Sequence, residues 1–216
     1  MKSNWLHHHA VRLLATVNMA MLSISCGELA RTGRSPAFIV VDALEAASGA
    51  APDAFGNVLN SDVETLVDQQ VDGRQTSVPV FFSDTGRATL RLGLKNPGDA
   101  DSPLRPSALN EITVTRYHVR FRRADGRNTP GVDVPHAFDG GVTVTIPADA
   151  TASLTFAVVR HQAKLEPPLN TLRRGGGANV ISTIAEITFY GRDQAGHDVA
   201  VMALLSVNFA DFHDPR

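Results

Sequence analysis

The strongest constraint on the fold is a two-residue alternation of apolar side chains near the end of the chain. One parity of residues 199–209 is apolar without interruption: Val199, Val201, Ala203, Leu205, Val207 and Phe209. Because successive side chains of a β-strand point to opposite faces, this period predicts a strand with one face in a core. An amphipathic helix would repeat every three to four residues instead.

Shorter segments upstream show the same signal. We predict strands at residues 38–41, 63–67, 78–82, 88–95, 111–123, 142–146, 154–158 and 181–190. In the segment 111–123 the apolar parity changes near Thr115 and Arg116, which predicts a β-bulge. Asp72-Gly73 between two such runs predicts a hairpin turn, because glycine adopts positive φ without strain. Residues 44–60 predict a loop, with one helical turn at most.

These strands, without a long amphipathic helix, indicate an all-β protein. Residues 161–179 contain a short helical pattern, a Pro-Pro break and a glycine run, and predict one long crossing connection. We therefore expect an antiparallel immunoglobulin-like (Greek-key) β-sandwich at 87–212. Residues 26–86 are acidic and the rest slightly basic, so we expect 37–86 to be a distinct strand and hairpin section packed on the sandwich.

The first 25 residues have a different character. Lys2 and Arg12 are the charged side chains there, and a mostly apolar stretch of about a dozen residues follows. This stretch is short for a membrane-spanning helix, which needs roughly 20 residues. We interpret residues 1–25 as a signal peptide and residues 26–36 as a polar tether.

The end of this leader reads Leu22-Ser23-Ile24-Ser25-Cys26, with the one cysteine of the chain. It resembles a bacterial lipobox, with small Ser25 before the cysteine and Ser23 where the motif usually has leucine. The resemblance implies cleavage before Cys26, lipid attachment to its thiol and a cell-envelope location. Gly27 in place of aspartate favours the outer membrane by analogy. Ordinary signal cleavage with secretion, or a buried free thiol, are the alternatives.

Familiar catalytic patterns are missing from the sequence. It contains no Gly-x-Ser-x-Gly, no His-Glu-x-x-His and no phosphate-binding loop ending in Gly-Lys-Ser/Thr. Asp193, His197 and Asp198 could offer cation ligands, but turn chemistry explains them as well. We predict a protein that is not an enzyme and needs no cofactor or metal. A hydrolase using His161 with Glu166 is an alternative.

One surface feature suggests a partner. Arg116, His118, Arg120 and Arg122 share a face of the predicted strand 111–123, about 7 Å apart along it. We predict that Arg116, Arg120 and Arg122 contact an anionic partner, either another envelope protein or an anionic polymer. A solvated face whose like charges deter aggregation is the other interpretation. The net charge of −2 argues against nucleic acid.

The leading hypothesis is a non-catalytic envelope lipoprotein with a structural or protein-binding β-sandwich. A secreted ligand- or carbohydrate-binding module is the main alternative. Its binding loops would be residues 99–106 and 130–139, where the rings of His136 and Phe138 could stack on a sugar.

Overall fold

The computed structural model describes residues 34–175 and 177–212. The signal peptide, Cys26 and most of the tether lie outside these residues. The protein is predominantly β, as predicted. Among the described residues, no helix is long and apolar enough to cross a bilayer.

The strands form two larger sheets and two small hairpins. The strands, with bounds, are β1 (Ala37–Ala47), β2 (Val58–Asp62), β3 (Thr65–Val71), β4 (Arg74–Val80), β5 (Asp84–Leu94), β6 (Gly98–Asp99), β7 (Ser102–Pro103), β8 (Ile112–Arg122), β9 (Phe138–Ile146), β10 (Ala152–Val159), β11 (Ile181–Asp193) and β12 (Asp198–Ala210). The three-stranded sheet has the order β1-β5-β10, and the five-stranded sheet the order β2-β12-β11-β8-β9. All neighbours in these two sheets are antiparallel except β2 and β12, which pair in parallel.

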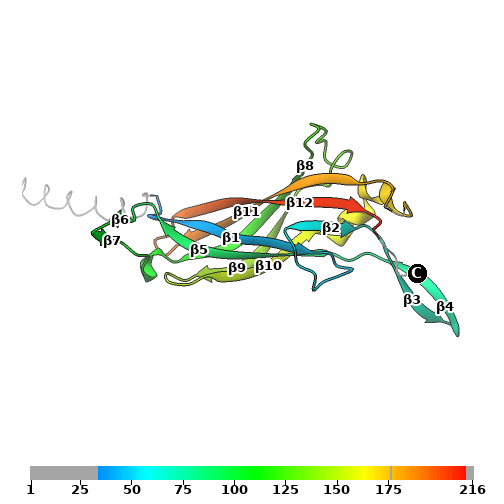
Figure 1. Ribbon diagram of the computed structural model, residues 1–216, viewed down its shortest axis with the longest axis horizontal. Coiled ribbons are helices and arrows are strands. Elements are labelled where there is room, and N and C mark those ends of the chain that lie inside the picture. The colour runs from blue at the N-terminus through cyan, green and yellow to red at the C-terminus, as the bar shows by residue number, and fades with distance from the viewer. Residues whose placement is uncertain (1–33, 176, 213–216) are drawn as a thin grey trace, which may run out of the picture.

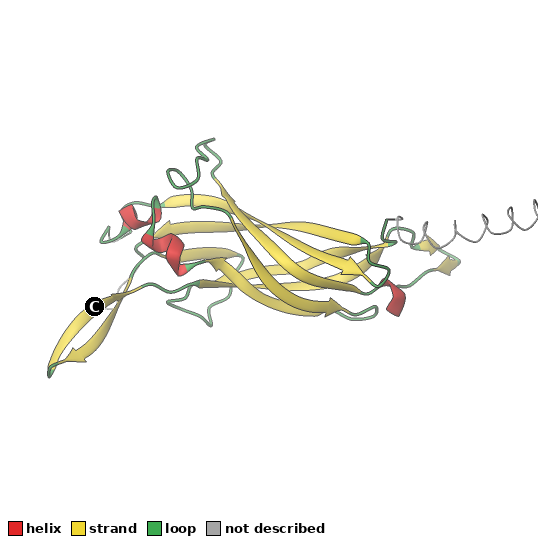
Figure 2. Ribbon diagram, turned by 180° about the vertical axis from the view of Figure 1, so that it is seen from behind, coloured by secondary structure: helices red, strands yellow, loops and turns green. Residues whose placement is uncertain are grey.

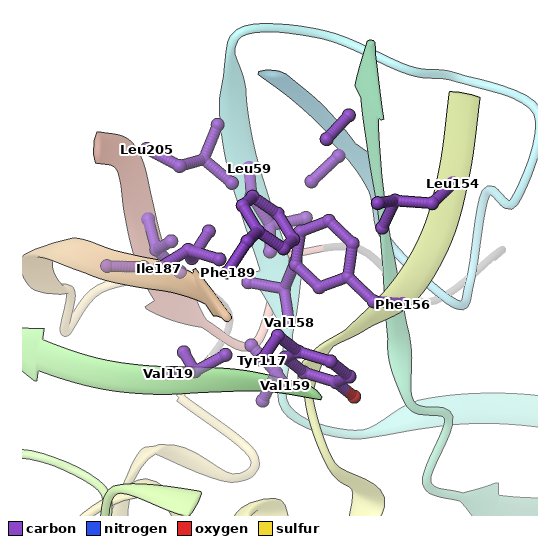
Figure 3. Packing of buried hydrophobic residues seen from close by; sticks show 14 of the residues in the cluster. Leu59, Tyr117, Val119, Leu154, Phe156, Val158, Val159, Ile187, Phe189 and Leu205 are labelled. Atoms are coloured by element: carbon purple, nitrogen blue, oxygen red, sulfur yellow. The ribbon is translucent and has the colours of Figure 1, made fainter. Parts of the chain in front are cut away.

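The inner faces of the two sheets share one hydrophobic core (Figure 3). Phe156 of β10 meets Phe189 of β11 edge to face, with ring centroids 5.3 Å apart. Tyr117 of β8 packs on Phe156, with ring centroids 5.1 Å apart. The alternating parity of β12 predicted its contribution: Leu205, Val207 and Phe209 are buried. Aromatic and aliphatic side chains from both sheets thus fill this core.

The predicted bulge and hairpin are both present. The β8–β9 register shifts between Val114 and Arg116, where the apolar parity changes in the sequence. Asp72 and Gly73 take φ of 51° and 75° and connect β3 to β4. The β3–β4 hairpin projects from one end of the elongated body, while β1 begins beside β6 and β7 at the other end (Figure 1).

One expectation differs from the structure. The segment predicted as a loop, 44–60, is strand at both ends, because β1 continues to Ala47 and β2 begins at Val58. Alanine and glutamate have low strand propensity, but pairing with β5 along the whole length of β1 outweighs it. Strand β5, which contains residue 86, pairs with β1 on one side and β10 on the other.

Short helices lie in the connections. The crossing between β10 and β11 holds α2 (His161–Leu165) and the 3-10 helix η2 (Leu169–Leu172), and η1 (Ala108–Asn110) precedes β8. Figure 2 shows the helical segments at the ends of the strands, outside the two sheets. The crossing places Lys164 beside Asp84, the first residue of β5, near the base of the β3–β4 hairpin.

Candidate functional site

The candidate site is the outer face of the five-stranded sheet, which we call the outer face. Side chains of β8 that alternate with the buried Tyr117, Val119 and Phe121 point outward from this sheet. The predicted arginines Arg116, Arg120 and Arg122 belong to this set, each with more than half of its side chain exposed. The strand period alone places them there.

Each of these arginines meets a carboxylate of a neighbouring strand. Arg120 Nε and Nη2 donate to Glu186 Oε2 at 2.9 and 2.6 Å, and Arg122 Nη1 donates to Oε1 at 3.3 Å. Arg116 Nη1 donates to Asp139 Oδ1 at 3.0 Å. The row is therefore a set of ion pairs rather than a line of uncompensated positive charge, which sequence spacing did not reveal.

The register of the sheet produces these pairs. Glu186 of β11 lies directly opposite Arg120, and Asp139 of β9 lies opposite His118. Burial tends to raise the pKa of Glu186, but the hydrogen bonds and positive charge of the two arginines outweigh it, and the net pKa is lowered. Glu186 is thus held ionised between them. Arg116 also stacks on Tyr190, with its guanidinium carbon 4.1 Å from the ring centroid.

Beside the arginines the outer face becomes apolar. Ile184 of β11 is 41% exposed, and Met202 and Leu204 of β12 are 58% and 60% exposed. Leu204 lies opposite Glu186 in the β11–β12 ladder, so apolar and charged side chains meet directly. Val58 of the edge strand β2 is exposed as well. We call Ile184, Met202 and Leu204 the apolar patch; the sequence analysis missed it because the opposite parity of β12 dominated the pattern.

Asp193, His197 and Asp198, which the sequence suggested as cation ligands, make hydrogen bonds and ion pairs within the β11–β12 hairpin. Asp193 Oδ1 accepts hydrogen bonds from the backbone N–H groups of Ala195 and His197, and its Oδ2 lies 2.8 Å from His197 Nδ1. Asp198 pairs with Arg192 across the hairpin. Among the described residues no group of three His, Cys, Asp or Glu side chains could hold a metal ion.

The structure does not bring His161 and Glu166 together in a hydrogen bond within the described part of the chain. His161 instead faces Ser83, whose Oγ accepts the His161 backbone N–H at 3.0 Å and lies 3.4 Å from Nδ1. Phe138, considered as a sugar platform, lies beneath the Arg160 guanidinium at 3.9 Å and beside Tyr117. Arg160 therefore covers one face of this ring.

A buried polar cluster at the base of the β3–β4 hairpin also escaped sequence reasoning. Asp84 at the start of β5 accepts hydrogen bonds from Ser61 and Gly49 and forms an ion pair with Lys164. Asp62 and Glu64, which follow Ser61 closely in sequence, are buried as well. Apart from an acidic residue at a strand end, no local pattern marks Asp84, because its partner is 80 residues away.

Comparison with known proteins adds little. No family model matches the chain, and no curated protein matches it. A solved structure described as Northeast Structural Genomics Consortium target SoR45 aligns with 81% of this chain and 86% of its own, at 12% identity and a TM-score of 0.31.

Proposed function

We propose that this protein is a non-catalytic lipoprotein of the bacterial cell envelope, anchored through Cys26, whose β-sandwich is a structural or protein-binding module. The observation that carries the binding role is the outer face. Protein interfaces combine apolar side chains with arginine, and contiguous exposed apolar groups on a sheet are a common mark of a contact surface. Ile184, Met202 and Leu204 meet both conditions beside Arg120 and Arg122.

The shape of the molecule supports an anchored arrangement. The described chain begins at one end of the long axis, and the β3–β4 hairpin projects from the other (Figure 1). Strand β5 connects these ends with 11 residues, a span of about 35 Å. A lipid on Cys26 would therefore hold one end at the bilayer and direct the hairpin away from it.

The finer fold class belongs to the same proposal. An immunoglobulin-like Greek key is supported by two facing sheets with one core and by the long crossing from β10 to β11. The parallel β2–β12 pair is a departure from that pattern.

Palmitate labelling in a bacterial host tests the anchor. We expect label in the full chain and none in Cys26→Ser, which should leave the membrane fraction. Unchanged fractionation of the variant would exclude lipidation as the anchor.

Site-specific photo-cross-linking in cells tests the outer face. A photoreactive residue at Met202 should give a discrete adduct with an envelope protein. The same residue at Thr155, exposed on the three-stranded sheet, is the matched control and should give none. Equal adducts at both positions, or adducts at neither, would argue against a binding role of the outer face.

A further inference from the structure

Lys164 and Asp84 form a buried pair of an amine and a carboxyl group. Lys164 Nζ lies 2.8 Å from Asp84 Oδ1, and the two side chains are 1% and 0% exposed. Helix α2 supplies the lysine and the first residue of β5 supplies the aspartate. The folded chain thus holds an amine nitrogen against a carboxyl group with water excluded.

As an ion pair this arrangement is costly. Removing an ammonium and a carboxylate from water is unfavourable for both ions, and only excellent pairing offsets it. An ammonium carries three N–H donors. Among the described residues, Asp84 Oδ1 is the acceptor that Nζ reaches. Lys164 is therefore underpaired as a cation, whereas an amide nitrogen with one hydrogen would carry no charge to desolvate.

The polar side chains that adjoin the pair are buried as well, Ser61 at 0% and Asp62 at 6% exposure. Asp62, which adjoins Ser61 in β2, has a pKa raised mainly by burial and also by the charge of Asp211, although the Thr65 hydroxyl, the Phe212 N–H and the charge of Lys164 each lower it. The positive charge of Lys164 lowers the pKa of Asp62, but burial outweighs it. The low polarity that raises its pKa also favours a neutral product at Asp84.

Both oxygens of Asp84 are held in place. The Gly49 N–H donates to Oδ1 at 2.8 Å, and the Ser61 hydroxyl donates to Oδ2 at 2.6 Å. Gly49 can approach because it has no side chain: a Cβ there would collide with Phe82 and with Ser83 O at 2.5 Å. Donors fixed on both oxygens stabilise the negative charge that develops when a nucleophile adds to a carboxyl carbon.

We propose that Lys164 and Asp84 join in the folded protein by an isopeptide bond between Nζ and Cγ. One proton passes from the ammonium to the carboxylate along their hydrogen bond, which leaves an amine and a carboxylic acid. The amine lone pair adds to Cγ and forms the N–C bond. The nitrogen then gives a second proton to one carboxyl oxygen, the C–O bond breaks, and that oxygen leaves as water. Charge and atoms balance without an oxidant or co-reactant.

The bond would connect the crossing segment to the strand that follows the β3–β4 hairpin. Residues 84 and 164 belong to different regions of the sequence, so the bond would close a loop of 80 residues. The bond would prevent the base of the β3–β4 hairpin from separating from α2 under mechanical force. This role is independent of the outer face and of lipidation.

A tryptic digest of the denatured full-length protein tests the proposal directly. Without the bond, trypsin releases residues 75–87, 161–164 and 165–173 as separate peptides. With it, Lys164 resists cleavage, and residues 75–87 and 161–173 appear as one species that is lighter than their sum by one water. Normal cleavage after Lys95 controls for trypsin activity. Recovery of the three free peptides would overturn the proposal.

Two variants separate this bond from other losses of water. In Asp84→Asn the same bond forms with loss of ammonia, so the cross-linked species should have the same mass as in the wild type. In Lys164→Met it cannot form, and residues 75–87 should appear at full mass. A peptide 75–87 still lighter by one water in Lys164→Met would place the loss elsewhere and overturn the proposal. The wild-type digest decides the question even if a variant fails to fold.

Discussion

The Tyr117 hydroxyl of one sheet accepts a hydrogen bond at 3.2 Å from the Ala157 backbone N–H of the other sheet. Ala157 lies where the β10–β5 register shifts, and the tyrosine satisfies a donor next to that irregularity. Tyr117→Phe keeps the ring packing and removes the acceptor. We expect a loss of about 1 kcal/mol in the free energy of unfolding, because a part-buried N–H loses its partner. Urea denaturation measures this change.

The control is the other tyrosine of the chain. Tyr190 lies on the outer face beneath Arg116, and Tyr190→Phe should change stability by no more than about 0.5 kcal/mol. Equal losses in the two variants would exclude the cross-sheet bond as the cause.

Gly140 makes room for the same tyrosine. A Cβ at this position would collide with Cζ and Oη of Tyr117, whereas a Cβ at Gly141 would meet nothing within 4 Å. Gly140→Ala should therefore destabilise the protein by roughly 1–3 kcal/mol, as overpacking does. Gly141→Ala should be neutral or slightly stabilising, because it restricts the unfolded chain. Thermal unfolding of this adjacent pair gives the comparison, and similar melting temperatures would contradict the packing argument.

Local patterns predicted the features that depend on neighbouring residues. The change of parity at Thr115–Arg116 located the bulge, and Asp72-Gly73 located the hairpin turn, because both follow from strand period and backbone sterics. The outward position of the arginine row followed from the same period.

Features that depend on register between distant segments could not be predicted. The opposition of Glu186 and Arg120 arises from the pairing of β11 with β8, which no local pattern specifies. The parallel pairing of β2 and the contact of Lys164 with Asp84 join segments far apart in sequence. The apolar patch was missed for another reason: the parity of β12 that holds Met202 and Leu204 also holds Asp198, Ser206 and Asn208, so it does not stand out as apolar in the sequence.

Asp193 should make stability depend on acid pH. Burial tends to raise its pKa, but hydrogen bonds from the His197 side chain and backbone and from Ser35 outweigh it, and the net pKa lies below the ordinary value of 3.8. The unfolded chain therefore binds the proton more readily. The stabilisation is present above the ordinary value and is lost as the pH falls through the lower folded value. The stability difference between wild type and Asp193→Asn should shrink over that window in pH-dependent urea titrations.

Asp62 should show the opposite sign. Burial raises its pKa above 3.8 in the folded protein, so the folded state binds the proton more readily than the unfolded chain. Relative to Asp62→Asn, the wild type should gain stability as the pH falls from the raised folded value toward the ordinary one. The same titrations measure both aspartates. Parallel slopes for the two variants would contradict the different environments assigned to them.

Glu186 separates the two interpretations of the arginine row. Glu186→Gln removes the carboxylate between Arg120 and Arg122, whose side chains are 55% and 54% exposed. Stability should change by less than about 1 kcal/mol, because exposed ion pairs contribute little. If the outer face binds anions, the freed arginines should increase retention on polyphosphate, and more salt should be needed for elution.

Glu45→Gln is the matched control for this experiment. It makes the same change in net charge and frees one arginine, Arg87, on the three-stranded sheet. We expect it to shift elution less than Glu186→Gln does, because it leaves a single cation and not a row. Equal shifts would mean that net charge alone governs retention. Arg120 and Arg122 would then be solvated partners of Glu186, and the apolar patch would remain as the part of the outer face that can select a partner.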